Sequence, residues 1–495
     1  MSKSKGKYLA IIDLGTGSIR LSVFDRSGQI REVRKAENPC LYPEPGYVEQ
    51  DAHVWWKELE GMFNDLPEEL RNELAAISVT GQREGIVPVD AQFLPMANLI
   101  TWLDTRTSEQ AELIRKELGE EFIYRETGLV HNPAWSLSKI LWLKKHRSHI
   151  FHSCHKFLQA VDYIQSRLSG KACTDVSMAS RTCMLQVSKR TWSKEILNRF
   201  DIKVEKLPDL YEAGQEIGEI APEAAEQFGL QTNVRIFAGA GDQQAAALGV
   251  GAFEEGSVSI GIGTSSALSM TIPHPVHIDE GNIILNCAAV PGKWEYEPPI
   301  WNTGSLVKWY QEQLDESDNS YGDSLAAADR IPPGAFGLMA LPYFSGAGSP
   351  RWDPGLSGGF YGLKLTHQRI HFLRAIMESI AFEIRMNIEL IEHSGVAVKQ
   401  IILSGGASQN LVLCQVVSDV LQKPVQIFEE TEASTWGLYC LVRMQLDEGS
   451  SIEEIHKSLN LNFQSLLPDL EKEQVYQETF RKYMELGDAL SKLNF

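Results

Sequence analysis

The segment AGAGDQQAAALGVG, residues 238–251, places one acidic side chain, Asp242, among glycine, alanine and glutamine. No lysine, arginine or histidine lies within four positions of Asp242, so no sequence neighbour neutralises its charge. A carboxylate beside a hydroxyl group can accept its proton while the oxygen attacks phosphorus. The small neighbouring side chains leave room for a substrate. Asp242 can also be a helix N-cap, because QQAAAL after an aspartate is a good capping sequence, and both roles can hold at once.

Three short glycine-rich turns have the composition of phosphate or nucleotide sites. DLGTGS (13–18) and GIGTSS (261–266) each follow an apolar stretch, and such turns let backbone N–H groups reach a phosphate closely. Asp13 can hold Mg²⁺ through water, or it can simply satisfy the amides of its turn. LSGGASQN (403–410) lets a nucleobase or ribose lie against the backbone, or it is a packing turn.

Charged and aromatic side chains follow the apolar stretch LAAISVT. Gln82, Arg83 and Glu84 offer donors and acceptors for several hydroxyl groups, and a surface salt bridge is the alternative. Trp102 and Trp135 have faces suited to the C–H surface of a sugar, although a tryptophan in an apolar run is more often part of a core.

The elements that must position these groups alternate between strands and helices, which indicates an α/β fold. Residues 8–30 predict a hairpin around the first turn, and residues 256–272 repeat the design, which indicates two related halves. Residues 331–363 predict an ordered loop, and residues 451–495 predict charged amphipathic helices. Helical periodicity predicts three further helices, over 132–147, 373–395 and 410–425.

The composition excludes several classes of protein. The 495 residues suggest about three domains or two large ones, and the net charge of -19 disfavours nucleic acid or an acidic membrane as partner. No run approaches the roughly 20 apolar residues of a membrane span, and the amino terminus lacks a full signal-peptide core. Seven scattered cysteines without a CxxC pair fit reduced thiols, so we expect a cytoplasmic location.

Common nucleotide and hydrolase motifs are missing. The chain has no GxxxxGK[ST], no HExxH and no GxSxG. GIGTSS comes close to the dinucleotide pattern GxGxxG but ends in Ser266 and precedes an expected strand rather than a helix. The glycine turns therefore belong to another phosphate-binding design.

In their order along the chain, the motifs resemble those of the FGGY family of carbohydrate kinases. DLGTGSIR and GIGTSS are similar to its two phosphate loops, QRE to its sugar-binding strand end and GAGDQQAAALG to the segment of its catalytic base. SPRWDPGLSGGFYGL with LRAIMESIAFEIR resembles the signature region, and LSGGASQN the adenosine site. The resemblance covers nearly the whole chain, and six motifs in the right order are specific.

The resemblance implies an α/β fold of two related actin-like ATPase (ribonuclease H-like) domains flanking a catalytic cleft. The first domain, residues 1–245, would bind the sugar and carry the first phosphate loop and the catalytic aspartate. The second domain, residues 246–495, would bind ATP.

The resemblance also implies roles for single residues. Asp242 would be the general base, free of a cationic partner, and Mg²⁺ would lie near Asp13 and Asp242. The sugar contacts would be Arg83, Glu84, Trp102, Asp242 and Gln243, with Trp135 as a further candidate. The nucleotide contacts would be Thr16, Gly17, Gly263, Thr264, Gly304, Gly405, Gly406, Ala407 and Asn410.

The leading hypothesis is an ATP-dependent phosphotransferase that acts on a hydroxyl group of a small sugar, ketose or polyol. Gln82-Arg83 replaces the Met-His pair that xylulokinases and gluconokinases often carry, and QRE is closer to glycerol kinases. REGIV resembles autoinducer-2 (linear dihydroxypentanedione) kinases. An actin-like nucleotide-dependent switch protein and a sugar-sensing regulator are alternatives from other classes. The substrate, the hydroxyl group and the oligomeric state, including a homodimer, stay open.

Overall fold

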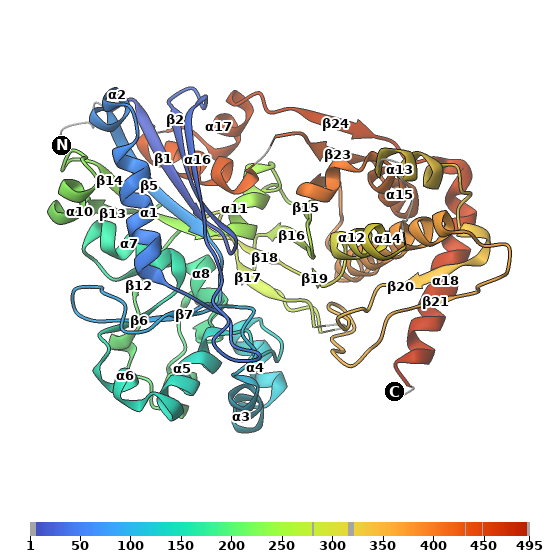
Figure 1. Ribbon diagram of the computed structural model, residues 1–495, viewed down its shortest axis with the longest axis horizontal. Coiled ribbons are helices and arrows are strands. Elements are labelled where there is room, and N and C mark those ends of the chain that lie inside the picture. The colour runs from blue at the N-terminus through green and yellow to red at the C-terminus, as the bar shows by residue number, and fades with distance from the viewer. Residues whose placement is uncertain (1–5, 280–281, 315–320, 431, 448, 493–495) are drawn as a thin grey trace.

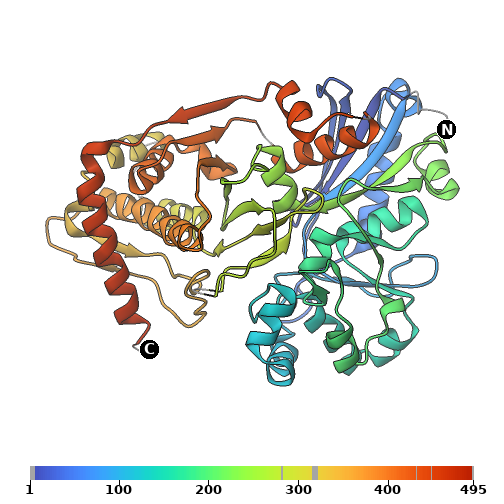
Figure 2. The ribbon, with the colours of Figure 1, turned by 180° about the vertical axis from the view of Figure 1, so that it is seen from behind.

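The computed structural model describes residues 6–279, 282–314, 321–430, 432–447 and 449–492. Two mixed β-sheets lie side by side, one built mainly by the first half of the chain and one by the second (Figure 1). The first strand, β1 (Tyr8–Leu14), lies in the left-hand half of this view and the last helix, α18 (Glu473–Leu490), in the right-hand half, and the view from behind shows the same arrangement reversed (Figure 2).

The first sheet has the strand order β13-β14-β5-β1-β2-β3. β5 runs parallel to β1 and to β14, whereas β2 is antiparallel to β1 and β13 is antiparallel to β14. The hairpin predicted over residues 8–30 is confirmed. The strands are β1 (Tyr8–Leu14), β2 (Ser18–Asp25), β3 (Ile30–Glu37), β5 (Leu74–Gly81), β13 (Glu216–Glu219) and β14 (Arg235–Gly241).

The second sheet, in the order β17-β18-β16-β15-β22-β23-β24, repeats the first. β22 runs parallel to β15 and to β23, whereas β16 is antiparallel to β15 and β24 is antiparallel to β23. The prediction of two related halves is therefore confirmed. The strands are β15 (Ser257–Ile262), β16 (Ser266–Ile272), β17 (Leu285–Cys287), β18 (Trp294–Tyr296), β19 (Pro299–Ile300), β22 (Gln400–Ser404), β23 (Val425–Phe428) and β24 (Phe463–Leu466).

The prediction of helices alone over residues 451–495 is wrong in one place. α17 (Ile452–Ser458) and α18 (Glu473–Leu490) are helices, but β24 lies between them and pairs with β23. β24 holds the position in the second sheet that β13 holds in the first. The edge of a sheet provides backbone partners to a short segment whose own sequence has no clear strand pattern.

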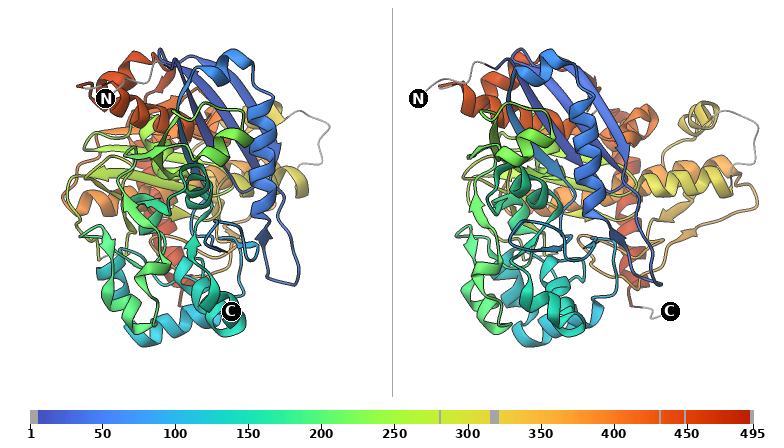
Figure 3. Two further views of the ribbon diagram at one scale, coloured as in Figure 1. Left: turned by 90° about the vertical axis from the view of Figure 1, so that its left-hand side faces the viewer. Right: turned by 60° about the vertical axis from the view of Figure 1, so that its left-hand side comes forward.

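Helices cover both faces of the first sheet. Ala10, Ile12 and Leu14 of β1 share a core with α1 (Ala52–Asn64) and α7 (Ala160–Ser169). The alternate residues Leu9 and Ile11 share another core with α11 (Asp242–Gly249) and α16 (Ala433–Leu446). Figure 3 shows α1 standing against the blue strands of this sheet. This alternation explains why β1 reads as a continuous apolar run.

The second sheet is covered in the same way. Ile401 and Leu403 of β22 share a core with α14 (Arg369–His393) and α15 (Leu411–Leu421), whereas Ile402 faces the core of α11 and α16. α11 and α16 therefore form one layer shared by the two sheets. They cross with their backbones in contact, since a Cβ atom at Gly249 would overlap the Ala433 carbonyl and one at Gly437 would overlap the Ala245 carbonyl.

The three predicted helices exist with shifted bounds. α5 (Ser136–His146) begins after its N-cap, Trp135, rather than at residue 132, and α14 begins four residues before residue 373. The predicted loop over 331–363 contains a two-stranded antiparallel sheet of β20 (Met339–Leu341) and β21 (Gly359–Tyr361).

The remaining elements are short connections, bridges and covering helices. They are β4 (Glu49–Gln50), α2 (Glu68–Asn72), β6 (Val87–Val89), β7 (Leu99–Ile100), α3 (Ser108–Leu118), α4 (Glu120–Thr127), α6 (Ser148–Ser153), β8 (Lys156–Leu158), β9 (Cys173–Asp175), α8 (Val176–Ser180), β10 (Leu185–Gln186), β11 (Thr191–Trp192), α9 (Lys194–Arg199), η1 (Val204–Lys206), β12 (Asp209–Tyr211), α10 (Pro222–Gln227), α12 (Gly304–Gln313), α13 (Tyr321–Asp329), η2 (Ala335–Gly337), η3 (Gly406–Gln409) and η4 (Leu470–Lys472).

All seven cysteines lie in the described part of the chain, and none of them forms a disulfide. Within the same ranges, no helix combines the length and the apolar character needed to cross a membrane.

Candidate active site

Asp242 lies where the parallel strands of the first sheet end. β1, β5 and β14 run in the same direction, so Asp13, the segment after Gly81 and Asp242 meet at one edge of the sheet. Asp242 is the first residue of α11, and its Oδ1 accepts the Gln243 N–H at 2.8 Å. The N-cap is Gly241, so the alternative that Asp242 is the N-cap is wrong. The Gly241 N–H donates to the Ser177 hydroxyl at 3.0 Å, which anchors the turn.

Asp242 has a cationic partner that its sequence neighbours do not supply. Nε of Arg83 lies 3.4 Å from Oδ1 of Asp242, so the expectation of an aspartate without such a partner is wrong. The interaction is weak in geometry, because the rest of the guanidinium faces Glu297. Nη1 and Nη2 of Arg83 donate to the two carboxylate oxygens of Glu297 at 2.7 and 2.8 Å.

The surroundings of Asp242 raise its pKa to about 7. Burial is the main cause of the higher pKa. The positive charge of Arg83 lowers the pKa, and the negative charges of Asp13 and Glu84 raise it further. One third of the side chain remains accessible, so a hydroxyl group can still approach. A carboxylate with a pKa near 7 is a stronger base than an ordinary aspartate and is suited to proton transfer at neutral pH.

This pKa predicts the pH dependence of turnover. A general base works only without its proton, so kcat/KM should fall about tenfold per pH unit below the pKa of Asp242, which is about 7 without metal and is lowered by Mg²⁺ beside it, and should level off above that pKa. The measurement is a steady-state pH profile from pH 5 to 9, with folding followed by circular dichroism.

Asp162→Asn is the matched control for this profile. Burial also raises the pKa of Asp162 to about 7, but its carboxylate accepts the Gln159 N–H in the cap of α7, and asparagine can accept the same bond. The control should keep the acidic limb. An acidic limb that persists in Asp242→Asn, or that is lost in the control, would contradict the role of Asp242.

The first glycine turn is held through its carbonyl groups. Asn38 Nδ2 donates to the Gly15 carbonyl at 2.8 Å, and Gln50 Nε2 donates to the Thr16 carbonyl at 2.7 Å. The Asn38 N–H donates to the Gly17 carbonyl at 3.1 Å. Gly17 is exposed and Thr16 is half-buried. Because these hydrogen bonds hold the carbonyl groups of the turn, its backbone N–H groups remain available to bind a phosphate.

The second glycine turn is held by the amino end of α12. The Gly304 N–H donates to the Gly263 carbonyl at 2.9 Å, and the Ser305 N–H donates to the Thr264 carbonyl at 3.1 Å. A Cβ atom at Gly304 would overlap the Gly263 carbonyl, so only glycine allows this approach. Thr264 is exposed. The structure therefore brings Gly263, Thr264 and Gly304 together.

The predicted adenosine segment lies beside the second turn. Gly405 has a φ of +88°, and a Cβ atom there would lie 2.8 Å from the Ile262 carbonyl. Gly406 is exposed with open space around it, and Ala407 lies against Gly304. Asn410 is the N-cap of α15, where its side chain accepts the Leu413 N–H at 3.0 Å. Its local role is therefore to start the helix.

Asp13 and Asp242 are two carboxylates with charges close enough to influence one another. The pKa of Asp13 is raised by burial, against a hydrogen bond from Ser434 and the charge of Arg20. The Ser434 hydroxyl donates to Asp13 at 2.8 Å from α16. In the described ranges, no three His, Cys, Asp or Glu side chains are grouped to hold a metal ion. Two carboxylates fit Mg²⁺, which usually keeps water and phosphate oxygens as its other ligands.

The other predicted sugar contacts lie in three places. Glu84, with a φ of +66°, accepts the Nε–H of Arg181 at 2.6 Å, and the Arg181 guanidinium lies 4.7 Å from the Trp135 ring centre. Trp102 is 40% exposed, and its Nε1–H donates to the Thr16 hydroxyl at 3.0 Å. A Cβ atom at Gly261 would lie 3.6 Å from Oε1 of Gln243, so this side chain faces the second sheet.

Arg181 and Glu297 are candidate site residues that the sequence motifs did not indicate. Glu297 follows β18 and is 2% exposed, and Arg181 follows α8 and is 7% exposed. One signal was available for Glu297. WEYEPP places two acids at alternate positions of a short aromatic strand, so both face the same side of the sheet.

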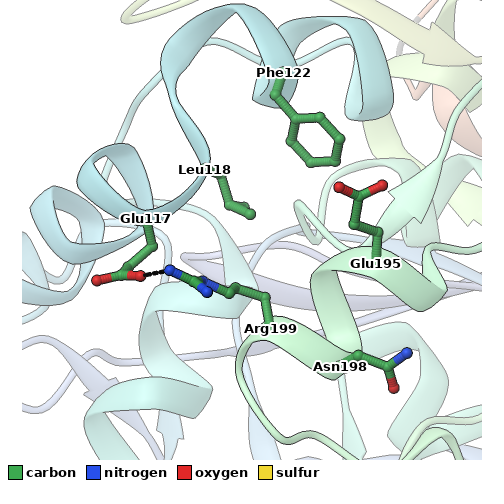
Figure 4. Close-up of a pocket in the computed structure, with 6 residues that line it drawn as sticks. All are labelled: Glu117, Leu118, Phe122, Glu195, Asn198 and Arg199. Atoms are coloured by element: carbon green, nitrogen blue, oxygen red, sulfur yellow. Dashed lines mark hydrogen bonds and ion pairs between the residues drawn. The ribbon is translucent and has the colours of Figure 1, made fainter.

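A separate surface hollow of about 550 Å³ lies between α3, α4 and α9. Figure 4 shows its lining, with Arg199 paired to Glu117 across it and Phe122 above. It contains none of the predicted site residues. The hollow therefore belongs to the covering helices rather than to the strand ends.

Comparison with known proteins identifies both halves of the chain. Residues 8–249 match the model of the FGGY family of carbohydrate kinases, N-terminal domain. Residues 258–445 match the model of the C-terminal domain of the same family.

Individual proteins match over nearly their whole length. A xylulose kinase from Staphylococcus xylosus is 27% identical over 97% of this chain and 100% of its own length. A glycerol kinase from Listeria monocytogenes is 30% identical over 95% of this chain and 97% of its own. The crystal structure of a gluconate kinase from Lactobacillus acidophilus has a TM-score of 0.93 at 25% identity and covers 99% of both chains.

Proposed function

Because the chain belongs to the FGGY family of carbohydrate kinases and is an ATP-dependent sugar or polyol kinase, we propose that Asp242 is the general base of its phosphoryl transfer. The acceptor is a hydroxyl group of a small sugar, ketose or polyol. Residues 1–245 bind this acceptor and residues 246–495 bind ATP. The observation that carries the proposal is an accessible carboxylate with a pKa near 7 at the strand ends that carry the first glycine turn.

The proposed reaction is an in-line transfer of the γ-phosphoryl group. Asp242 accepts the proton of the attacking hydroxyl group, and the backbone amides of the two glycine turns stabilise the developing charge on the phosphate oxygens. Thr16, Gly17, Gly263 and Thr264 contact the phosphates. The proposed nucleoside site is lined by Gly304, Gly405, Gly406 and Ala407. Asn410 acts indirectly, because it caps α15, the helix that follows this segment.

Trp102 connects the proposed acceptor site with the first glycine turn. Its exposed ring offers a face for the acceptor, and its hydrogen bond to Thr16 ties that face to the first glycine turn. Glu84 and Gln243 complete the proposed acceptor contacts. Arg83 takes part through its ion pair, because its guanidinium is already bonded to Glu297 and Gln244.

Asp13 and Asp242 are the proposed protein ligands of Mg²⁺, directly or through water. The ion would neutralise charge on the phosphate oxygens of ATP. Chelation should therefore lower ADP release to background, and added MgCl₂ should restore it. Because two carboxylates are the proposed protein ligands, the melting temperature should change little without the metal. Full turnover in EDTA would contradict this part of the proposal.

The test of the function is an ADP-release screen of the purified chain with MgATP. The acceptors are pentuloses, hexuloses, glycerol, erythritol, gluconate and the linear dihydroxypentanedione. One acceptor should raise ADP release far above the rate without acceptor. ADP release that no acceptor changes would favour the actin-like switch protein. Turnover of glycerol would favour a glycerol-type kinase, and turnover of the linear dihydroxypentanedione would favour an autoinducer-2 kinase.

A further inference from the structure

The first glycine turn is bonded on its carbonyl side and open on its amide side. Asn38 and Gln50 donate to its three carbonyl groups. No described residue accepts a hydrogen bond from the N–H of Thr16 or of Gly17. A Cβ atom at Gly17 would meet no atom within 4 Å, so the turn has open space beside it. The side chains behind the turn therefore decide where its unused N–H groups point.

The side chain of Gln50 uses its whole amide group behind the turn. Its Nε2 donates to the Thr16 carbonyl at 2.7 Å and to the Asn38 carbonyl at 3.2 Å. Its Oε1 accepts the side-chain N–H of Gln82 at 2.6 Å. The side chain is fully buried, so water does not replace these bonds. An amide with both hydrogens and its oxygen engaged has one orientation.

Gln82 connects Gln50 to the edge of the sheet that carries Asp242. Gln82 follows β5, and its backbone N–H donates to the Leu14 carbonyl at the end of β1 at 3.0 Å. β5 lies between β1 and β14, and β14 leads directly into Asp242. Gln50 therefore ties the glycine turn to the middle strand of the three that meet at the proposed base.

Asn38 holds the other two carbonyl groups of the turn, and it is fixed in its own place. Nε1 of Trp55, on α1, donates to Oδ1 of Asn38 at 2.8 Å, and both side chains are buried. We call Trp55, Asn38, Gln50 and Gln82 the amide network. Within this network, Gln50 is the member that contacts both the turn and the end of β5.

We propose that Gln50 is a positioning residue for the phosphoryl transfer, which holds the Thr16 and Gly17 N–H groups in a fixed place relative to Asp242. This inference rests on the proposed function, because it concerns the phosphates that the turn would bind. Donors that are already oriented stabilise charge on a phosphate without the cost of reorganising the turn. A turn released from Gln50 keeps its sequence but loses this orientation.

The first test is Gln50→Met, which keeps the length of the side chain and removes its donors. Binding of the non-hydrolysable analogue MgAMP-PNP should weaken about tenfold by calorimetry, since bonds to a charged phosphate need aligned donors. With the acceptor that the ADP-release screen identifies, kcat/KM for ATP should fall about a hundredfold, because a displacement of about 1 Å can cost that much. KM for the acceptor should stay within about twofold of the wild-type value.

Asn387→Leu is the matched control. Asn387 of α14 is also fully buried, and its Nδ2 donates to the Ser349 and Glu383 carbonyls at 3.1 and 3.0 Å. Its Oδ1 accepts the Ser349 hydroxyl at 2.7 Å, so it makes the same three kinds of bond as Gln50. Both variants should lose a comparable amount of thermal stability. The control should keep its kcat/KM for ATP and its affinity for MgAMP-PNP within about twofold.

The outcomes separate this inference from the proposed function. Wild-type kinetics and binding in folded Gln50→Met, or an equal loss of both in the control, overturn the role of Gln50 and leave the kinase function standing. If Gln50→Met does not fold, Gln50→Asn replaces it. Its amide is one methylene shorter and cannot bridge Thr16 and Gln82, so both quantities should still fall severalfold, and wild-type values overturn the inference.

The wild-type chain supplies the remaining comparison. If it binds MgAMP-PNP but turns over no acceptor, the proposed function is overturned, and the binding measurement on Gln50→Met still decides whether Gln50 positions the turn. A wild-type chain that does not bind MgAMP-PNP overturns both.

Discussion

The Asp242→Asn variant should lose about a thousandfold in kcat while its affinity for the acceptor changes only a few-fold. The substitution keeps the size of the side chain and the hydrogen bond from the Gln243 N–H, but it removes the base. It also leaves Arg83 bonded to Glu297, so that buried ion pair is preserved. Steady-state kinetics and acceptor binding by calorimetry measure the two effects separately.

Asp51→Asn is the control for Asp242→Asn. Asp51 is the N-cap of α1 in the same half of the chain, where its side chain accepts the His53 N–H at 2.9 Å. Asparagine caps helices about as well as aspartate, so stability and turnover should match the wild type. Near-normal turnover of a folded Asp242→Asn protein would remove Asp242 from the role of general base.

Gly437→Ala should destabilise the protein by about 3 kcal/mol or more, since the added methyl group cannot be placed without moving a backbone. A Cβ atom at Gly437 would overlap the carbonyl oxygen of Ala245, which belongs to α11. α11 and α16 are the layer that both sheets share, so a shift there separates Asp13 from Ser434 and disturbs the start of α11 at Asp242. Thermal unfolding and turnover should therefore fall together.

Gly61→Ala tests whether a methyl group in any helix has this effect. Gly61 lies inside α1, and a Cβ atom there would meet no atom within 4 Å. Alanine is the better helix former by about 1 kcal/mol, so this variant should be unchanged or slightly more stable. A Gly437→Ala protein that melts at the wild-type temperature would show that the helices separate without cost.

The two hairpins could be predicted from the sequence because their signals are local. β-Branched residues on both sides of a glycine turn specify strand, turn and strand within about 20 residues. The same holds for Asp242, since the small residues before it and the helix formers after it place an acid at a strand-to-helix junction. The repeat of the design also predicted two halves of one topology, which the two sheets have.

The buried ion pairs of Arg83 with Glu297 and of Glu84 with Arg181 could not be predicted, because they join distant segments. Arg83 and Glu297 are 214 positions apart, and Glu84 and Arg181 are 97 apart. A single sequence shows that these charges exist but not which of them meet. The same limit produced the wrong expectation for Asp242, whose cationic partner comes from the end of another strand.

β24 was missed for a related reason and has a practical consequence. The C-terminal family match ends at residue 445, before β24 begins. A protein shortened to the matched region would therefore lose the strand that pairs with Val425–Phe428 and leave their backbone groups open to solvent. An uncovered strand edge recruits other chains, so such a fragment should self-associate on expression even though every predicted site residue is present.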